Sequence, residues 1–373
     1  MTRIISVLSI ALFLALCFSF ANSTSARAAV EIGEGIELYG DARARMEWDE
    51  RSSFAGIDEE RDRQRYRLRV GFVYTPPELP LELGARFVSG SFGDANSQHQ
   101  TLGNDGDFSK NSLSIDKAFI KAKYKGGWLW FGKNSVPLWM QNGYFWDTDV
   151  NPEGVAFGYT LKDLGPVALT VQGGQFVLDD GGWHDTNGAT SNGDTDVDLW
   201  MAQLVVVTEL EPVDVTFAYG IVDTDEGATV RGGGVTTLEA TYTLASLQAK
   251  VKAIENVGIT VGYDYFSGDV PSVTPGSDED AGSVITLKGS YKKAWAKVAL
   301  LDIDLHAVSP FAQDDFSSYY SDFEGTALHI GYKFTKKINV ELIQYAGERK
   351  LDAPAAADPE ELERVRLNFN MKF

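Results

Sequence analysis

The sequence predicts an all-β fold: one transmembrane antiparallel β-barrel, with sixteen strands as the preferred count. Runs of about ten residues alternate between apolar and polar side chains along the whole chain, as transmembrane strands do. The links between these runs alternate between short and long, and the last run ends on an aromatic residue, Phe373. Beyond residue 29, no apolar run approaches the roughly 20 residues of a spanning helix. Membrane insertion would therefore require a closed barrel, in which every backbone polar group is paired.

The first 28 residues have the features of a secretory signal peptide. Arg3 supplies a positive charge, Ile4–Phe20 carries no charge, and Ala26-Arg27-Ala28 is a small-x-small site that predicts cleavage after Ala28. An uncleaved N-terminal anchor is the alternative, although the uncharged run is at the short limit for a spanning helix. The predicted organisation is a signal peptide over residues 1–28 and a single barrel domain over residues 29–373.

Composition excludes several classes of function. The chain has 33 basic and 53 acidic residues, a net charge of −20, which argues against binding to nucleic acid. Cys17, the one cysteine, lies in the predicted signal peptide, so disulfides and thiol chemistry are not expected in the mature chain. The four histidines have no metal-ligand spacing, and no GxSxG motif occurs. We therefore predict no enzyme, no metal site and no cofactor.

The alternation also orients the predicted strands. In the clearest run, the apolar positions of Tyr66–Tyr74 alternate with Arg65, Arg67 and Arg69. In the final run, the apolar positions of Val365–Phe373 alternate with polar residues. Aromatic residues at the ends of such runs suit the interfacial girdles of a membrane barrel better than a soluble sandwich.

The lengths of the links give the predicted strand count. Seven short and eight long links imply sixteen strands, with short periplasmic turns, long extracellular loops and both termini on the periplasmic side. Residues Thr236–Ile254 are expected to form one strand with a bulge near Ala245-Ser246, and a hairpin is the alternative. The link Asn134–Pro152 could also contain a strand. Counts of fourteen and eighteen therefore remain as alternatives.

The charged positions predict a basic wall inside the barrel. A charged side chain facing lipid costs about 2–4 kcal/mol near the midplane, so the charged face of each strand should line the lumen. The last strand closes beside the first and would continue this wall. Its predicted members are Arg43, Arg45, Arg65, Arg67, Arg69, Arg86, Lys121, Lys123, Lys133, Arg364 and Arg366.

The link Asn134–Pro152 is the predicted acidic counterpart of this wall. It carries Asp147 and Asp149 and is followed by Glu153. It is also rich in aromatic residues that are hard to leave in water, so we expect it to fold into the lumen. There it would set acid against the basic wall and select hydrated solutes. A loop packed at the barrel mouth, without a role in selection, is the alternative.

An ordered set of segments carries a resemblance to a known family. The segments are Arg63–Gly71, Gln100–Gly103, Ile115–Ile120, Phe131–Lys133 and Trp146–Gly154. Together they resemble the putative porin family of Gram-negative outer-membrane β-barrel channels, except that Lys117 stands where the family usually has Arg. The resemblance implies passive diffusion of small solutes, often through homotrimers. The aromatic-ended last strand also resembles the signal read by the barrel-assembly machinery.

These observations predict a porin of the cell outer membrane that passes small hydrophilic solutes through a water-filled pore, in contact with the lipid bilayer and lipopolysaccharide. One alternative is a barrel that holds a partner, such as a cytochrome electron conduit or an export complex. Another is a substrate-specific channel for anions or acidic sugars. Co-purification of a partner would favour the first alternative, and a conductance that a solute saturates would favour the second.

Overall fold

The chain is described here from a computed structural model. The described residues are 29–52, 58–90, 96–103, 110–179, 197–224, 229–230, 234–235, 239–252, 255–270, 280–309, 322–350 and 360–373. The predicted signal peptide, residues 1–28, lies outside them. In the part of the chain that is described, no helix is long and apolar enough to cross a membrane.

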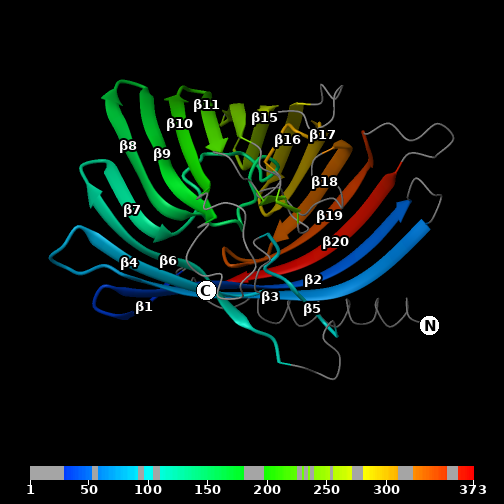
Figure 1. Ribbon diagram of the computed structural model, residues 1–373, viewed down its shortest axis with the longest axis horizontal. Coiled ribbons are helices and arrows are strands. Elements are labelled where there is room, and N and C mark those ends of the chain that lie inside the picture. The colour runs from blue at the N-terminus through cyan, green and yellow to red at the C-terminus, as the bar shows by residue number, and fades with distance from the viewer. Residues whose placement is uncertain are drawn as a thin grey trace.

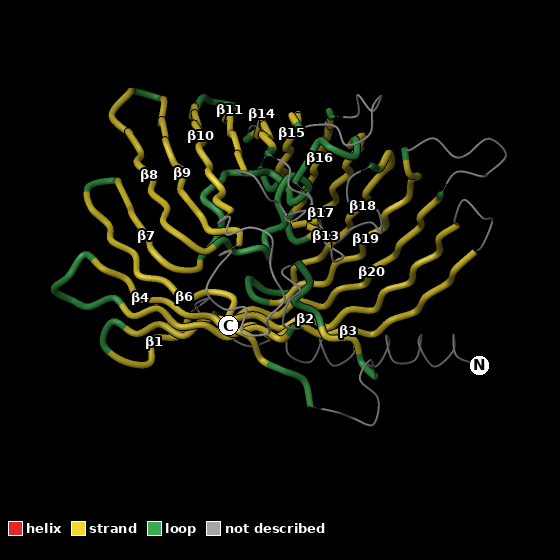
Figure 2. Tube along the Cα trace, in the orientation of Figure 1, coloured by secondary structure: helices red, strands yellow, loops and turns green. Residues whose placement is uncertain are grey.

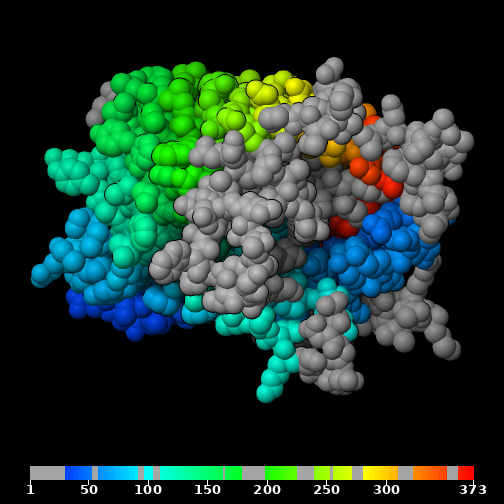
Figure 3. All heavy atoms as spheres, viewed as in Figure 1, coloured from blue at the N-terminus to red at the C-terminus, as the bar shows by residue number. Residues whose placement is uncertain are grey.

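Sixteen strands close into an antiparallel β-barrel, so the predicted fold class and preferred count are confirmed (Figure 1). The strands are β2 (Ile36–Ser52), β3 (Asp58–Tyr74), β4 (Leu81–Ser89), β6 (Leu113–Tyr124), β7 (Gly127–Lys133), β8 (Glu153–Leu164), β9 (Val167–Asp179), β10 (Val197–Glu209), β11 (Val213–Thr224), β14 (Ala240–Val251), β15 (Val257–Asp269), β16 (Ala281–Tyr291), β17 (Ala294–Ile303), β18 (Phe323–Lys333), β19 (Ile338–Arg349) and β20 (Glu361–Lys372). Each strand pairs with the next, and β2 pairs with β20 to close the barrel. Figure 3 shows the blue ends of β2 and β3 beside the red end of β20.

Four further strands are short: β1 (Ala29–Gly33), β5 (Gln100–Thr101), β12 (Thr229–Val230) and β13 (Gly234–Val235). β5 pairs with Arg65 and Tyr66 of β3, beyond the point where β4 ends. β1 pairs with the start of β2, next to the position where Gly40 exchanges two backbone hydrogen bonds of 3.1 and 3.0 Å with Phe373. A Cβ at Gly40 would lie 2.5 Å from the Phe373 ring, so this close approach requires glycine.

The outward face follows the predicted alternation. On β11, Phe217, Tyr219 and Ile221 are 42%, 44% and 38% exposed, whereas Ala218 and Val222, which have the opposite parity, are buried. Exposed bands of large apolar side chains belong in lipid rather than in water. The faces predicted for the clearest alternating runs are therefore the faces found.

The region Thr236–Ile254 corrects one detail of the prediction. β14 is a single strand, and its register with β11 and β15 runs through Ala245 and Ser246 without a shift, so the expected bulge is absent there. Tyr242 and Leu244 are buried on the inward face, so the inward positions in this part of β14 are apolar. The apparent change of phase in the sequence came from these inward apolar residues.

An apolar core occupies one side of the barrel interior. Inward residues of β8 to β18, such as Phe176, Leu244 and Phe266, pack with Phe145 and Trp146 from the link 134–152. The rings of Phe145 and Phe266 lie 5.4 Å apart between centroids. Figure 2 shows loop segments in the middle of the ring of strands. Because apolar packing fills this side, the polar part of the lumen lies along β2, β3, β4, β19 and β20.

Candidate functional site

The link 134–152, the constriction loop, folds into the barrel and crosses it, as its aromatic content led us to expect. No strand lies within these described residues. Trp139 N donates to Gln203 Oε1 of β10 at 2.6 Å, and Gln203 Nε2 donates back to Trp139 O at 2.9 Å. Gln141 Nε2 and Asn142 Nδ2 donate to the two carboxylate oxygens of Asp264 on β15 at 2.7 and 2.5 Å. Neutral amides thus bind this end of the loop to the far wall.

The other end of the constriction loop contacts the basic wall directly. Asp149 Oδ1 lies 3.2 Å from Arg69 Nη1, and Asp149 Oδ2 lies 3.4 Å from Arg67 Nη1. A tight turn positions this carboxylate, because Asp149 N donates to Asp147 Oδ1 at 2.8 Å. The acidic loop is therefore paired with the wall and does not face it across an open gap.

A second inward segment, residues Asn96–His99, was not predicted. Gln98 Nε2 donates to Asp116 Oδ2 at 2.9 Å and to Asp149 O at 3.2 Å, which links β6 to the constriction loop. Arg65 Nη2 donates to Ser97 Oγ at 2.7 Å. The sequence signal is an uncharged run of amide, hydroxyl and imidazole side chains, since such groups can fill a buried site when each finds a partner.

Most of the predicted wall residues point into the barrel. Arg45, Arg65, Arg67, Arg86, Arg364 and Arg366 are between 3% and 8% exposed, and Arg43 and Arg69 share their faces of β2 and β3. Lys121 and Lys123 of β6 face inward nearer the short-turn end. Lys121 Nζ lies 4.9 Å from the Trp128 ring centroid, and Lys123 pairs with Glu82.

Lys133 and Glu153 lie elsewhere than expected. Lys133 of β7 and Glu153 of β8 form an ion pair. Lys133 lies opposite Ala118 and Glu153 in the register, and Phe131, two residues before Lys133, lies opposite Val155. Phe131 is 66% exposed, so this register places both charges on the outer face, away from the wall and the constriction loop. The run Trp128–Phe131 is apolar at every position, so alternation could not show which side chains of β7 face inward.

The sequence interpretation also overlooked the carboxylates that share the inward face with the arginines. Glu47, 1% exposed, accepts from Arg366 Nε at 2.6 Å and also pairs with Arg63. Arg364 Nε lies 2.7 Å from Asp49 Oδ1. Arg86 contacts Asp116 through two nitrogens. The inner face of β2, β3 and β20 is therefore an ion-pair network. The sequence indicated these carboxylates, because Asp41, Glu47 and Asp49 alternate in phase with Arg43 and so share its face of the strand.

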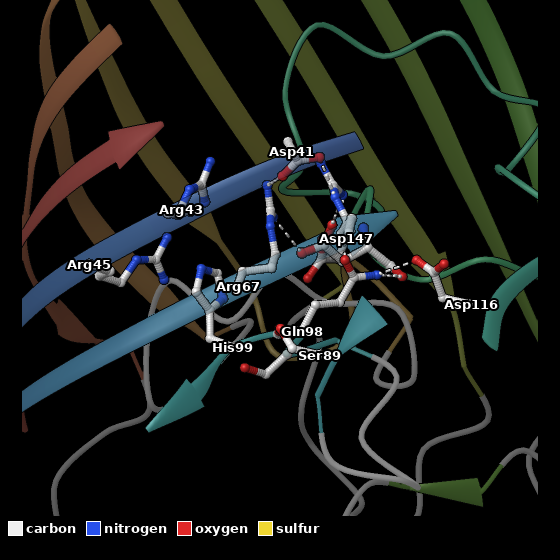
Figure 4. Close-up of polar contacts among 12 residues, drawn as sticks. Asp41, Arg43, Arg45, Arg67, Ser89, Gln98, His99, Asp116 and Asp147 are labelled. Atoms are coloured by element: carbon white, nitrogen blue, oxygen red, sulfur yellow. Dashed lines mark hydrogen bonds and ion pairs between the residues drawn. The ribbon is translucent and has the colours of Figure 1, made fainter. Parts of the chain in front are cut away.

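The constriction loop, the segment Asn96–His99 and the wall line an open cavity of about 310 Å³, the constriction cavity. Five arginines (Arg43, Arg45, Arg67, Arg69 and Arg366) and three carboxylates (Asp147, Asp149 and Glu341) line it. Figure 4 shows Arg43 and Arg45 on β2, Arg67 on β3 and His99 near one another, with Asp147 to one side of Arg67. Burial and the nearby Arg45 hold the pKa of His99 well below its usual range. The imidazole is therefore neutral among the arginines at neutral pH.

A second cavity, of about 510 Å³, lies nearer the short turns. Aromatic side chains such as Trp128 and Trp139 line it together with Lys117 and Lys121. Its walls come from the strands around the constriction loop, so the polar interior has one chamber with an aromatic lining and one rich in arginine.

Solved structures with this fold are outer-membrane proteins. OprB of Pseudomonas putida has a TM-score of 0.58 at 12% identity, with 91% of this chain and 94% of that chain covered. An anion-selective porin from Comamonas acidovorans has a TM-score of 0.54 at 12% identity, covering 91% and 99%. The trimer form of OmpT from Vibrio cholerae has a TM-score of 0.51 at 14% identity, covering 91% and 99%. At these identities the likeness shows the fold. A search of curated proteins found no match.

A family model provides the stronger relation. The family described as "Putative porin" matches residues 20–229, more than half of the chain's 373 residues. Both the family and the barrel fold are those of Gram-negative outer-membrane proteins. The sixteen-stranded barrel with a loop folded inside it agrees with that assignment, and the chain belongs to the putative porin family of the outer membrane.

Proposed function

We propose that small hydrophilic solutes diffuse passively through this barrel, along a water-filled path that follows the basic wall past the constriction loop. The observation that carries the proposal is the loop's attachment at both ends, to Asp264 on the far wall and to Arg67 and Arg69 on the basic wall. A loop held in this way narrows the lumen without closing it, since the arginine-lined cavity of about 310 Å³ remains beside it.

The charged side of the lumen is the natural route for water and ions. Apolar packing fills the opposite side, where a hydrated solute would lose hydrogen bonds to water. Along the wall, guanidinium and carboxylate groups can replace those bonds, as charged rings do in channels. Arginines outnumber carboxylates around the cavity by five to three, which favours the passage of anions.

The proposal covers the rest of the chain as well. Residues 1–28 would be removed as a signal peptide, and residues 29–373 would form the barrel domain. The barrel-assembly machinery would fold it into the membrane, where contacts with the lipid bilayer and lipopolysaccharide surround it. We also propose a homotrimer, as in the trimer form of Vibrio cholerae OmpT. Transport would involve no catalytic step.

A barrel that encloses a protein partner is less compatible with this interior. The constriction loop crosses the lumen from Gln203 and Asp264 to Arg69, and a partner would have to displace it. Purification in mild detergent separates these functions. A porin should appear alone or as a homotrimer, whereas a stoichiometric cytochrome or lipoprotein would favour the enclosing role.

Planar-bilayer recording of the purified protein tests the proposal. We expect stepwise, long-lived conductance. Replacing Arg65, Arg67 and Arg69 together by Gln should shift the reversal potential in a salt gradient toward cations, because three positive charges are lost and Asp41 and Asp149 would lose their arginine partners. A barrel that inserts and never conducts would overturn the proposed function. An unchanged reversal potential would remove these arginines from the selectivity of the pore.

A further inference from the structure

We propose that the constriction cavity contains a binding site for a small dianionic oxyanion, of the phosphate and sulfate class, centred on Arg43. The inference rests on the proposed function, because such an anion reaches the cavity only through the lumen. It goes further than the passage of anions, since it predicts that an anion binds saturably at a defined position on β2.

Arg43 differs from the other arginines of the cavity in having no carboxylate partner among the described residues. Its Nε donates to Asn370 Oδ1 at 2.6 Å, and within the described chain its terminal nitrogens contact no acceptor. By contrast, Arg67 Nη2 lies 2.9 Å from Asp41 and Arg366 Nε lies 2.6 Å from Glu47. The bond to Asn370 therefore orients a guanidinium whose outer edge is free for a ligand.

That free edge suits an oxyanion. A guanidinium presents two parallel N–H groups that match two oxygens of a phosphate or carboxylate, and such charge-assisted pairs are about twice as strong as neutral hydrogen bonds. Because the bond at Nε fixes the plane of the Arg43 side chain, little rotational freedom is lost when the anion binds.

The charge of the cavity favours a dianion over a monoanion. Five arginines face three carboxylates, and Arg43, Arg67 and Arg69 come from neighbouring strands, where their like charges repel. A buried cation without a counterion is costly. Asp41 and Glu47 already pair with Arg67 and Arg366, so the position that lacks a counterion is Arg43. A dianion bound there would neutralise Arg43 and direct its second charge toward Arg67, which lies opposite Arg43 in the register of β2 and β3, whereas a monovalent carboxylate has no second charge to offer.

The cavity wall also has hydrogen-bond donors in surplus. Asn368 is fully buried, its Oδ1 accepts from Arg45 Nε at 2.8 Å, and its Nδ2 has no acceptor within the described part of the chain. Among the described residues, His99 Nε2 is likewise buried without a partner, and it donates in the tautomer that carries the proton there. Buried polar atoms of this kind are uncommon, and the oxygens of a bound anion could accept hydrogen bonds from the donors among them.

The size of the cavity is consistent with a tetrahedral oxyanion. At about 310 Å³ it could hold roughly ten waters, each having a share of about 30 Å³ of liquid volume. A phosphate ion with part of its hydration shell fits in such a space. The ion would meet Arg43 from β2, Arg67 from β3 and Asn368 from β20, and tetrahedral oxygens can accept from these different directions.

Block of chloride current by inorganic phosphate in planar bilayers tests the site. With the full-length mature protein in potassium chloride at neutral pH, added phosphate should reduce the current and the effect should saturate. Arg43→Gln should raise the half-blocking phosphate concentration about tenfold or more, the effect of losing one charge-assisted hydrogen bond. Arg43→Lys keeps the positive charge but lacks the two parallel N–H groups. Its half-blocking phosphate concentration should lie between those of the wild type and Arg43→Gln. Acetate, a monoanion, should block far less than phosphate.

Arg51→Gln is the matched control, because Arg51 lies on the same strand and the same face as Arg43. It pairs with Glu59 at the barrel mouth, where its side chain is 44% exposed. This variant should keep the wild-type half-blocking concentration. If Arg43→Gln does not insert, the comparison of Arg43→Lys with Arg51→Gln decides the question.

The outcomes separate this inference from the proposed function. Steady conductance without phosphate block in the wild-type protein would overturn the oxyanion site and leave the porin function standing. Equal block of wild-type and Arg43 variants would place the anion elsewhere and would also overturn it. Absence of any conductance would remove the proposed function itself.

Discussion

Asp149 Oδ1 lies 3.2 Å from Arg69 Nη1, and this ion pair joins the constriction loop to the basic wall. From the opposite side, Asp41 Oδ2 lies 2.6 Å from Arg69 Nε. Arg67 has the same two carboxylates as partners. Two arginines are thus held between a carboxylate fixed in β2 and another on the loop. The loop carboxylate therefore neutralises part of the positive charge that these two arginines present to the lumen.

Asp149→Asn should increase the preference for anions. The substitution removes the loop carboxylate from Arg67 and Arg69, whereas the bonds of Gln141 and Asn142 to Asp264 keep the loop inside the barrel. The reversal potential in a potassium chloride gradient should shift toward the anion value with little change in conductance. Asp214→Asn, at the short-turn end beside the exposed Lys252, is the control. A shift of equal size in the control would exclude Asp149 as the cause.

Asp264→Ala should enlarge the conductance. Asp264 accepts hydrogen bonds from Gln141, Asn142 and Ser246, and its loss frees the loop from the far wall. Each buried donor left without an acceptor costs about 1–3 kcal/mol, so the free energy of unfolding in urea should fall as well. Asp198→Asn, whose partner Gln175 is exposed, should change neither quantity. Wild-type conductance in Asp264→Ala would mean that the loop does not need this anchor.

Glu47→Gln should be the most destabilising single neutralisation in the wall. Glu47 is 1% exposed and lies within reach of Arg45, Arg63, Arg65 and Arg366, so its loss leaves buried cations without a counterion. Breaking a buried ion pair costs about 3–5 kcal/mol. Glu59→Gln, which breaks an exposed pair with Arg51, should cost at most about 1 kcal/mol. Urea unfolding followed by tryptophan fluorescence compares the two, and similar losses would contradict the buried network.

His99 should make the barrel less stable in mild acid. Burial and Arg45 hold its pKa well below the usual value, so the folded protein resists a proton that the unfolded chain takes up near pH about 6.5. The free energy of unfolding should therefore fall as the pH drops through that range, in which most carboxylates stay ionised. His99→Gln should lose less stability over the same pH interval. Parallel pH profiles for the two proteins would argue against this role of His99.

The predictable part of the structure is where one strand face meets lipid and the other meets a polar lumen. Tyr66–Tyr74 and Val365–Phe373 have such faces, and their strands and orientations followed directly from alternation. The rule fails where the interior is apolar. Leu244 and Trp130 point inward although they look lipid-facing, and for this reason the bulge in β14 and the position of Lys133 were misjudged.

The candidate site was predictable only on one side. The aromatic content of residues 134–152 indicated an inward loop, but its partners Gln203 and Asp264 lie 64 and more than 100 residues further along the chain. No local pattern identifies which distant strand a loop will meet, because that depends on the register of the closed barrel. The carboxylates at Asp41 and Glu47, by contrast, could be read from their parity with Arg43.

The pairing of Glu47 with Arg366 has a consequence for how the barrel assembles. The two residues are 319 positions apart and belong to the first and last barrel strands, so their contact is among the last that a growing sheet can make. Before closure, both free edges present arginines and carboxylates to water. Charged, inward-pointing side chains discourage an open edge from pairing with another chain. We therefore expect the charged contact between β2 and β20 to disfavour pairing between copies that have not yet closed.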